Sequence, residues 1–197
     1  MRIPANLNLK KGWIYECIVT TYGNGRENAA PIGITTQDME TIIMDIYKDT
    51  ETCRNILKNK EFVINIISNV DAFHESILEE EKLEYIKSKN VNAPILRNSN
   101  SYLEMTVINA ENSDDRIRFT SEIVNLRIRG DIRLINRAEC IVLESLIIAT
   151  KLPYVTGERW EFLKENLEEN YRIICRIAPN SKFQKFIEKL IHEYRLL

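Results

Sequence analysis

One apolar segment of the chain opens with small and rigid residues. The stretch ENAAPIGI places Asn28, Ala29, Ala30 and Pro31 before Ile32, although Ala, Asn and Pro are all depleted in strands. Small side chains leave backbone N–H and C=O groups uncovered, so a flat ligand such as an isoalloxazine ring can lie against the chain and hydrogen-bond to it. A tight edge strand packed on a neighbour has the same composition, and these residues alone favour neither interpretation.

A second segment, KDTETCRN at residues 48–55, carries groups that suit a phosphate. The cations Lys48 and Arg54 and the hydroxyls of Thr50 and Thr52 stand where a strand is expected to end and a helix to begin. A helix N-terminus presents unpaired N–H groups and a partial positive charge, which attract anions. The two carboxylates within the segment would repel a phosphate dianion, however. Capping of the helix by Thr50 or by the aspartate before it explains the segment without a ligand.

Other polar residues favour structural roles. Two histidines and four widely spaced cysteines show no metal-ligand or disulfide spacing, so no metal site is predicted, and no side chain is identified as a catalytic acid or base. Strand arginines can form a basic face for nucleic acid, but the net charge of −2 and the lack of interleaved aromatics favour a solvated face paired with acidic residues. The arginines are Arg116, Arg118, Arg127, Arg129 and Arg133, and the expected partners are Glu104, Glu111, Asp114 and Glu122.

Composition is that of a globular protein of 197 residues, with 44% hydrophobic and 28% charged residues. The N-terminal stretch has no apolar leader, and no run approaches the roughly 18 apolar residues that span a membrane. We therefore expect a cytoplasmic protein with reduced thiols, without affinity for membranes, and without the basic excess that is typical of nucleic-acid binding.

Hydrophobic periodicity predicts an antiparallel β domain followed by helices. Residues 14–21 alternate as a strand, and the turn at residues 22–25 closes a hairpin onto residues 29–34. Further expected elements are strands near 39–47, 61–68, 102–109 and 116–134, a short helix near 54–57, a helical pattern at 70–89 and a loop at 91–100. Three helical patterns follow residue 136, and they are separated by Pro153 and by Pro179-Asn180-Ser181, where Ser181 is expected to cap the third helix.

The order of these segments resembles the flavin-binding split-barrel superfamily, which includes flavin reductases and pyridoxamine-phosphate-oxidase-like proteins. More closely, the chain is similar to a family of uncharacterised, mostly archaeal proteins that share the helical C-terminal part. The residues that carry the resemblance are ECIVTT, NAAPIGI, TIIMDIYKDTETCRNI, EFVINII and RAECIVLESLIIATKL.

The resemblance implies an α+β fold, with an antiparallel split β-barrel over residues 1–135 and a C-terminal helical subdomain over residues 136–197. It also implies FMN bound at or near a homodimer interface. On the ring side it points to Asn28, Ala29, Ala30, Pro31 and Ile32, and on the phosphate side to Lys48, Thr50, Thr52, Arg54 and Asn55. Asn65 is expected to be structural.

Three functions compete at this stage. The first is an FMN-binding oxidoreductase similar to NAD(P)H-dependent flavin reductases, in which the redox chemistry belongs to the cofactor. The second is a non-enzymatic dimeric module that binds flavin. The third is a β domain that binds nucleic acid or another partner through the strand arginines.

Overall fold

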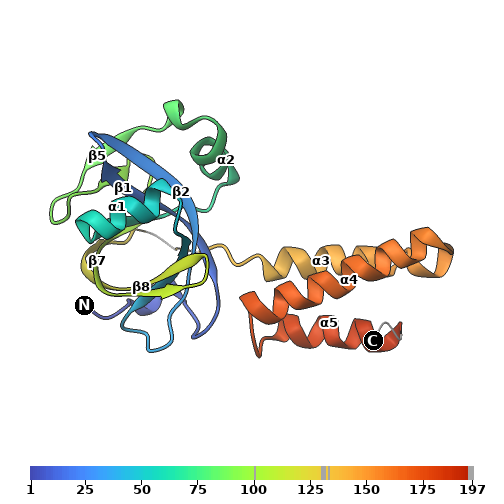
Figure 1. Cartoon of the computed structure of the whole chain (residues 1–197). Helices are drawn as coiled ribbons and strands as arrows, with labels where there is room; N and C mark the ends of the chain where they lie inside the picture. Colours follow the sequence, from blue (N-terminus) through green and yellow to red (C-terminus); the bar gives the residue numbers. More distant parts are fainter. Residues whose placement is uncertain (100, 130–131, 133, 195–197) are drawn as a thin grey trace. The chain divides into compact units, whose positions relative to one another are not determined.

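The computed structural model describes residues 1–99, 101–129, 132 and 134–194. The chain forms two compact units (Figure 1). The β unit comprises Met1–Lys11 and Tyr15–Ile135, and the helical unit comprises Gly12–Ile14 and Asn136–Leu197.

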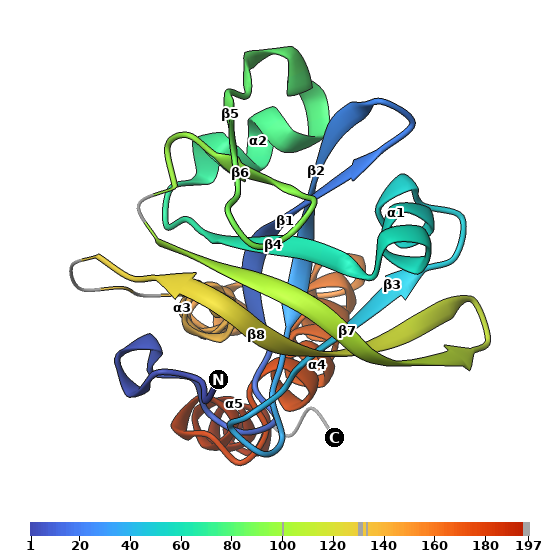
Figure 2. The same ribbon diagram turned by 90° about the vertical axis from the view of Figure 1, so that its left-hand side faces the viewer.

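The β unit is built on a six-stranded, fully antiparallel sheet in the order β2-β1-β4-β7-β8-β3. The two edge strands approach each other at one bridge, where Thr35 and Ile43 exchange backbone hydrogen bonds of 3.0 and 2.8 Å. The sheet therefore curls on itself, as Figure 2 shows. Its strands are β1 (Tyr15–Gly23), β2 (Arg26–Ile34), β3 (Ile42–Tyr47), β4 (Glu61–Ile66), β7 (Ser101–Ser113) and β8 (Arg116–Arg127).

A tight turn joins β1 to β2. Gly23 pairs with Arg26, so the loop is only Asn24-Gly25, and both of these residues have positive φ (53° and 81°). This is the backbone that a two-residue hairpin requires, and Asn-Gly is the sequence most suited to it. The predicted hairpin is thereby confirmed.

Two helices and a small hairpin complete the β unit. Helix α1 (Glu51–Asn59) follows β3, and its N-cap Thr50 accepts a hydrogen bond from the backbone N–H of Cys53 at 3.2 Å. Helix α2 (Val70–Leu78) precedes a short 3-10 helix (Glu80–Lys82). The small hairpin consists of β5 (Tyr85–Lys87) and β6 (Pro94–Leu96).

The prediction of a helix over residues 70–89 is therefore wrong in its second half. The predicted loop at residues 91–100 is also wrong in part, because it contains the strand β6. Leu83 and Tyr85 pack on a cluster that includes Ala29 of β2, while β5 pairs with β6. These contacts come from distant parts of the sequence. They override the local helical period, which counts only neighbouring residues.

Two buried polar side chains anchor this hairpin region to the sheet. Asn65 donates to the carbonyl of Ile18 at 3.1 Å and accepts from the N–H of Leu96 at 2.9 Å, so its role is structural. The carboxylate of Glu104 accepts from the backbone N–H groups of Lys89 and Asn90 at 3.2 and 3.0 Å. Glu104 thus binds loop amides rather than the arginine partner expected from the sequence.

The helical unit contains α3 (Ala138–Ala149), a 3-10 turn (Leu152–Tyr154), α4 (Glu158–Ile177) and α5 (Lys182–Glu193). The three predicted helices are confirmed, as is the cap at Ser181, which accepts from the N–H of Gln184 at 3.1 Å. Their inward faces form one core. Residues 12–14 join this core: the indole of Trp13 donates to the carbonyl of Pro179 at 3.2 Å. No helix in the described part of the chain is long and apolar enough to cross a membrane.

The connection between β2 and β3 is held by one carboxylate. Asp38 accepts hydrogen bonds from the backbone N–H groups of Glu40 and Thr41 at 2.7 and 2.8 Å, and from the Thr41 hydroxyl at 2.8 Å. These hydrogen bonds stabilise the ionised carboxylate of Asp38, and the largest effect comes from the Thr41 N–H. They lower the pKa of Asp38 from 3.8 to about 2.

We expect Asp38→Asn to lower the free energy of unfolding at neutral pH. The pKa of Asp38 is depressed in the folded state, so its stabilisation is complete above about pH 4 and is lost as the pH falls to about 2. Urea unfolding of both proteins between pH 2 and 7 measures the difference. A difference that stays constant across that range would contradict this role of Asp38.

Candidate functional site

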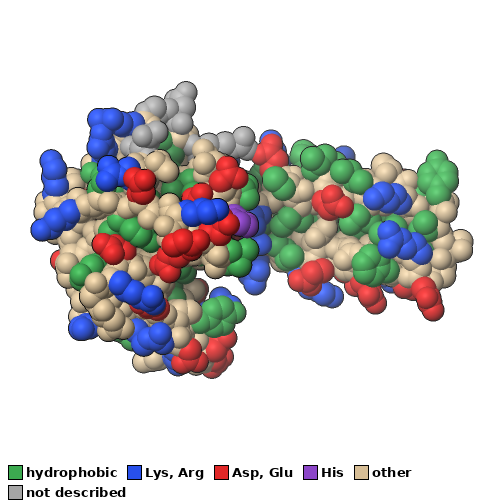
Figure 3. Space-filling model, turned by 90° about the horizontal axis from the view of Figure 1, so that it is seen from above, with side chains coloured by type: hydrophobic (Ala, Val, Ile, Leu, Met, Phe, Trp, Pro, Cys, Tyr) green, Lys and Arg blue, Asp and Glu red, His purple; other side chains and the backbone are tan. Residues whose placement is uncertain are grey.

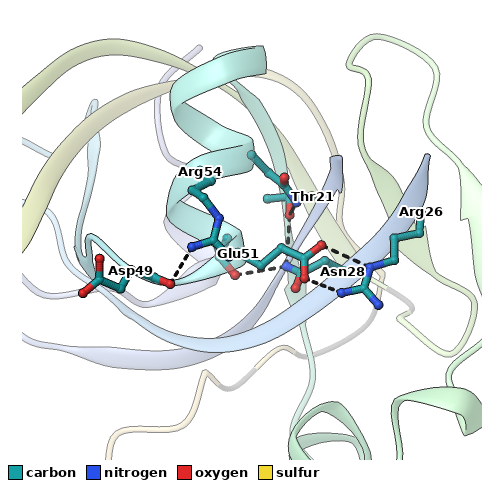
Figure 4. A network of polar contacts seen from close by, with 8 residues as sticks. Thr21, Arg26, Asn28, Asp49, Glu51 and Arg54 are labelled. Carbon is teal, nitrogen blue, oxygen red and sulfur yellow. Dashed lines mark hydrogen bonds and ion pairs between the residues drawn. The ribbon is translucent and has the colours of Figure 1, made fainter. Parts of the chain in front are cut away.

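A polar network joins the β1–β2 hairpin to helix α1 (Figure 4). The hydroxyl of Thr21 accepts from the side-chain amides of Asn28 at 3.0 Å and of Asn55 at 3.1 Å. The Asn28 amide also donates to the hydroxyl of Thr52 at 3.0 Å. Asn28, Thr52 and Asn55 come from both segments singled out in the sequence, and the fold brings them together around Thr21.

Local geometry explains why these residues meet. The tight turn at Asn24-Gly25 fixes the register of the hairpin, and this register places Thr21 opposite Asn28 on one face. Thr52 and Asn55 lie three residues apart on α1, and residues at that spacing share a helix face. Thr21 was missed by the sequence analysis. The two-residue turn could have identified it, because it determines which residue pairs with Asn28.

Gly23 leaves room for this network. A Cβ atom at Gly23 would lie 1.8 Å from Oδ1 and 2.3 Å from Cγ of Asn55. Asn55 is buried, so its side chain cannot move aside freely. Only glycine allows the end of β1 to approach α1 this closely.

The two alanines of β2 have different surroundings. Ala29 is 6% exposed and packs with Ile18, Ile67 and Leu96. Ala30 points to the opposite face, because side chains alternate along a strand, and it is only partly buried. The clearance expected from both residues therefore exists at Ala30, while Ala29 is part of the core.

The backbone of β2 is open along one edge. Within the described residues β2 pairs with β1 on one side only, and the bridge at Thr35 is the sole pairing on the other. Pro31 and Ile32, which precede that bridge, are partly buried. The carbonyl of Ile32 already accepts from the thiol of Cys17 at 3.3 Å. The other backbone N–H and C=O groups along this edge can hydrogen-bond to a planar ligand. Proline is tolerated in an edge strand because its missing N–H removes no hydrogen bond to a neighbouring strand.

The first turn of α1 combines opposite charges. Glu51 pairs with Arg26 of β2 through contacts of 3.2 and 2.5 Å, and the carboxylate raises the pKa of Arg26. Arg26 was also missed by the sequence analysis, yet it offsets the negative charge that argued against a phosphate here. Arg54 is exposed and donates to the carbonyl of Asp49 at 2.7 Å, which leaves other guanidinium N–H groups for a ligand.

Two predicted phosphate residues also have structural partners. Thr50 caps α1 and donates to the carbonyl of Tyr47 at 2.8 Å. The ammonium group of Lys48 donates to the carbonyl of Asp114 in the β7–β8 turn at 2.7 Å. Part of their hydrogen-bonding capacity is therefore already used, and their role toward a phosphate stays a prediction.

A separate hollow of about 350 Å³ lies against the other face of the hairpin, where Tyr22 pairs with Glu27. Tyr85 and Lys87 of β5 also line it. The Tyr85 hydroxyl is buried without a hydrogen-bond partner in the described structure, and burial raises its pKa. None of the residues predicted to bind the cofactor lines this hollow.

The remaining candidates keep structural or surface positions. His74 is exposed near Glu79, and Cys53 is buried in α1. Arg118 forms two contacts of 2.8 Å with Asp45 of the neighbouring strand, and Arg133 lies outside the described residues. Across the described part of the chain no three His, Cys, Asp or Glu side chains group as metal ligands would.

Comparison with known proteins identifies the family. Residues 15–130 match the model of the N-terminal domain of DUF447, a protein of unknown function. The chain belongs to the DUF447 family. A curated relative, the uncharacterised protein MJ1453 of Methanocaldococcus jannaschii, is 26% identical over 148 residues, which cover 71% of this chain and 74% of the relative.

Solved structures share the fold. The FMN-bound protein MM1853 of Methanosarcina mazei, also assigned to DUF447, superposes with a TM-score of 0.56 at 24% identity over 98% of this chain and 99% of its own. The NADH:FAD oxidoreductase SgcE6 of Streptomyces globisporus gives a TM-score of 0.55 at 11% identity over 61% and 79%. These likenesses confirm the predicted α+β split-barrel fold. The family match confirms the resemblance to a family of uncharacterised proteins.

We expect Gly23→Ala to lower the free energy of unfolding by about 1–3 kcal/mol, because the added methyl group displaces the Asn55 side chain. Chemical denaturation measures this loss of unfolding free energy. The matched control is the same substitution in an Asn55→Ala background, which lacks the atoms that clash. Gly23→Ala should lower the free energy of unfolding much less in that background. Equal costs in the two backgrounds would show that the close contact is not what excludes a side chain at this position.

Proposed function

We propose that this DUF447 protein binds FMN along the open edge of β2 and at the N-terminal end of α1. The observation that carries the proposal is the contact between the two candidate segments, where Asn28 reaches Thr52 at 3.0 Å. A strand edge with little side chain thus lies next to a helix N-terminus. That combination suits a molecule with a flat ring at one end and a phosphate at the other. The FMN-bound family member MM1853 supports the same ligand.

The residues present fit the cofactor. The backbone of Ala30, Pro31 and Ile32 would face the ring, because it forms the open side of β2. Arg54 and the first turn of α1 would hold the phosphate, while Arg26 offsets the charge of Glu51. FMN supplies hydride and electron transfer when it is bound. The chain supplies orientation and charge, and no side chain is assigned as an acid or base.

Ala30→Tyr should weaken FMN binding by about 100-fold or more, roughly 3 kcal/mol, because a large side chain would fill the partly exposed face of β2. Titration with FMN, followed by flavin fluorescence, measures the change. Ile108→Tyr is the matched control, because Ile108 is an exposed residue of β7 outside both candidate segments. Unchanged affinity in a folded Ala30→Tyr variant would place the ring elsewhere.

We further propose that the protein is an oxidoreductase similar to NAD(P)H-dependent flavin reductases. The fold shared with the S. globisporus NADH:FAD oxidoreductase supports this activity. The alternative is a dimeric module that binds flavin without turnover. A homodimer with FMN near its interface belongs to the same proposal, because a ring that lies on one strand edge leaves its other face open for a second copy to cover. A cytoplasmic location is also part of the proposal.

Anaerobic mixing of the FMN-loaded protein with NADH or NADPH separates the two alternatives. We expect the visible absorbance of the flavin to bleach as it is reduced, and to return when air is admitted. Free FMN at the same concentration is the control for reduction without the protein. A loaded protein that shows no bleaching with either nucleotide would exclude the reductase and favour the binding module.

A further inference from the structure

The hollow of about 350 Å³ beside Tyr22 is formed by two hairpins of the β unit. Tyr22 and Glu27 are cross-strand partners of β1 and β2, so their side chains share one face of that hairpin. Tyr85 and Lys87 stand two positions apart on β5, and side chains at that spacing also share a face. Each hairpin therefore contributes one aromatic and one charged side chain to the hollow, and the two charges are opposite.

The loop between β5 and β6, which forms one wall of the hollow, is held by two carboxylates. Glu104 accepts from the backbone N–H groups of Lys89 and Asn90 at 3.2 and 3.0 Å. Glu61 accepts from the backbone N–H of Asn92, a residue that lines the hollow, at 2.7 Å. A wall fixed in this way does not have to be ordered when a ligand binds, and such a preformed hollow is typical of small-molecule sites.

Three polar groups that line the hollow have no partner in the described structure. The hydroxyl of Tyr85 is buried without a hydrogen bond, which costs free energy unless a ligand supplies one. Burial is the main cause that raises the pKa of Tyr85, and the carboxylates of Glu80 and Glu27 raise it further. The side chains of Glu27 and Lys87 are exposed, and neither forms an ion pair within the described residues. All three groups can therefore bind a ligand.

The local charges, rather than the charge of the whole surface, indicate which ligand fits. Figure 3 shows acidic and basic side chains interspersed over the β unit, so no single sign dominates the face that it displays. A ligand with one charge would pair with either Glu27 or Lys87 and be repelled by the other. A ligand that carries both an ammonium group and a carboxylate would satisfy both residues. The rings of Tyr22 and Tyr85 and the buried Pro94 suit an aromatic body between these charges.

We propose that this hollow binds a small aromatic zwitterion of the α-amino-acid type. Its ammonium group pairs with Glu27 and donates a hydrogen bond to the Tyr85 hydroxyl, and its carboxylate pairs with Lys87. Its ring packs on Tyr22 and the apolar wall. None of the predicted FMN residues lines the hollow, so this site is independent of the proposed flavin site.

Calorimetric titration of the whole chain with three related probes tests the proposal. L-phenylalanine carries both charges, 2-phenylethylamine carries only the ammonium group, and 3-phenylpropionate carries only the carboxylate. Each probe with a single charge should bind about tenfold more weakly than L-phenylalanine, because it loses a hydrogen-bonded ion pair. No binding of L-phenylalanine at about 10 mM, or equal binding of all three probes, would overturn the proposal.

Two charge variants test where each end of the probe lies. Glu27→Gln should weaken the binding of L-phenylalanine and 2-phenylethylamine and leave 3-phenylpropionate unaffected. Lys87→Gln should weaken L-phenylalanine and 3-phenylpropionate and leave 2-phenylethylamine unaffected. Glu122→Gln is the matched control, because Glu122 is an exposed residue of β8 outside the hollow. Variants at positions 27 and 87 that bind all three probes as the control does would place the probes elsewhere.

Tyr85→Phe separates binding from stability. The Tyr85 hydroxyl has no partner to lose, so its removal should not lower the free energy of unfolding, but it should weaken L-phenylalanine binding about fivefold or more. Lowered stability with unchanged affinity would show that the hydroxyl is only structural and would contradict its role here. The titration is repeated at saturating FMN, where the affinity should be the same. Displacement of the probe by FMN would mean that it occupies the flavin site, which would overturn the proposal.

Discussion

The register of the β1–β2 hairpin is the constraint on which the candidate site depends. Because the loop is only Asn24-Gly25, each residue of β1 has one partner on β2, and a slip by one position would move every side chain to the other face. The observed register places Thr21 beside Asn28 under α1. It also places Gly23 where Asn55 needs space. The site is therefore set by a turn that contributes no side chain to it.

This register also gives the two alanines of β2 different surroundings. Ala29 faces a hydrophobic cluster that includes residues near α2 and β5, whereas Ala30 lies on the partly exposed face. Neighbouring small residues thus have separate physical reasons: one fits a packed core, and the other leaves a strand edge uncovered. The packed face of ENAAPIGI fits the interpretation as a tight strand, and the partly exposed face is the one that we propose faces the ring.

Electrostatics around α1 follow the same logic. Taken as a string, KDTETCRN places carboxylates among the groups expected to bind a phosphate. In the fold, Arg26 from β2 pairs with Glu51, and the hydroxyl of Thr50 caps the N-terminus of α1. The charge available at the helix N-terminus is thus decided by a residue that is 25 positions away in the sequence.

The sequence by itself determined the features that depend on neighbouring residues. Alternation identified the principal strands, Asn24-Gly25 identified the hairpin, and Thr50 and Ser181 were recognisable as helix caps. Only the tertiary structure decided which segments meet. It brought Asn28 to Thr52, buried Ala29 in the core, paired Arg26 with Glu51, and made residues 85–87, which were expected to be helical, the strand β5. The physical reason is that local propensity amounts to less than about 1 kcal/mol per residue, whereas the burial of distant side chains against one another contributes more and selects among conformations that the local sequence leaves nearly equal.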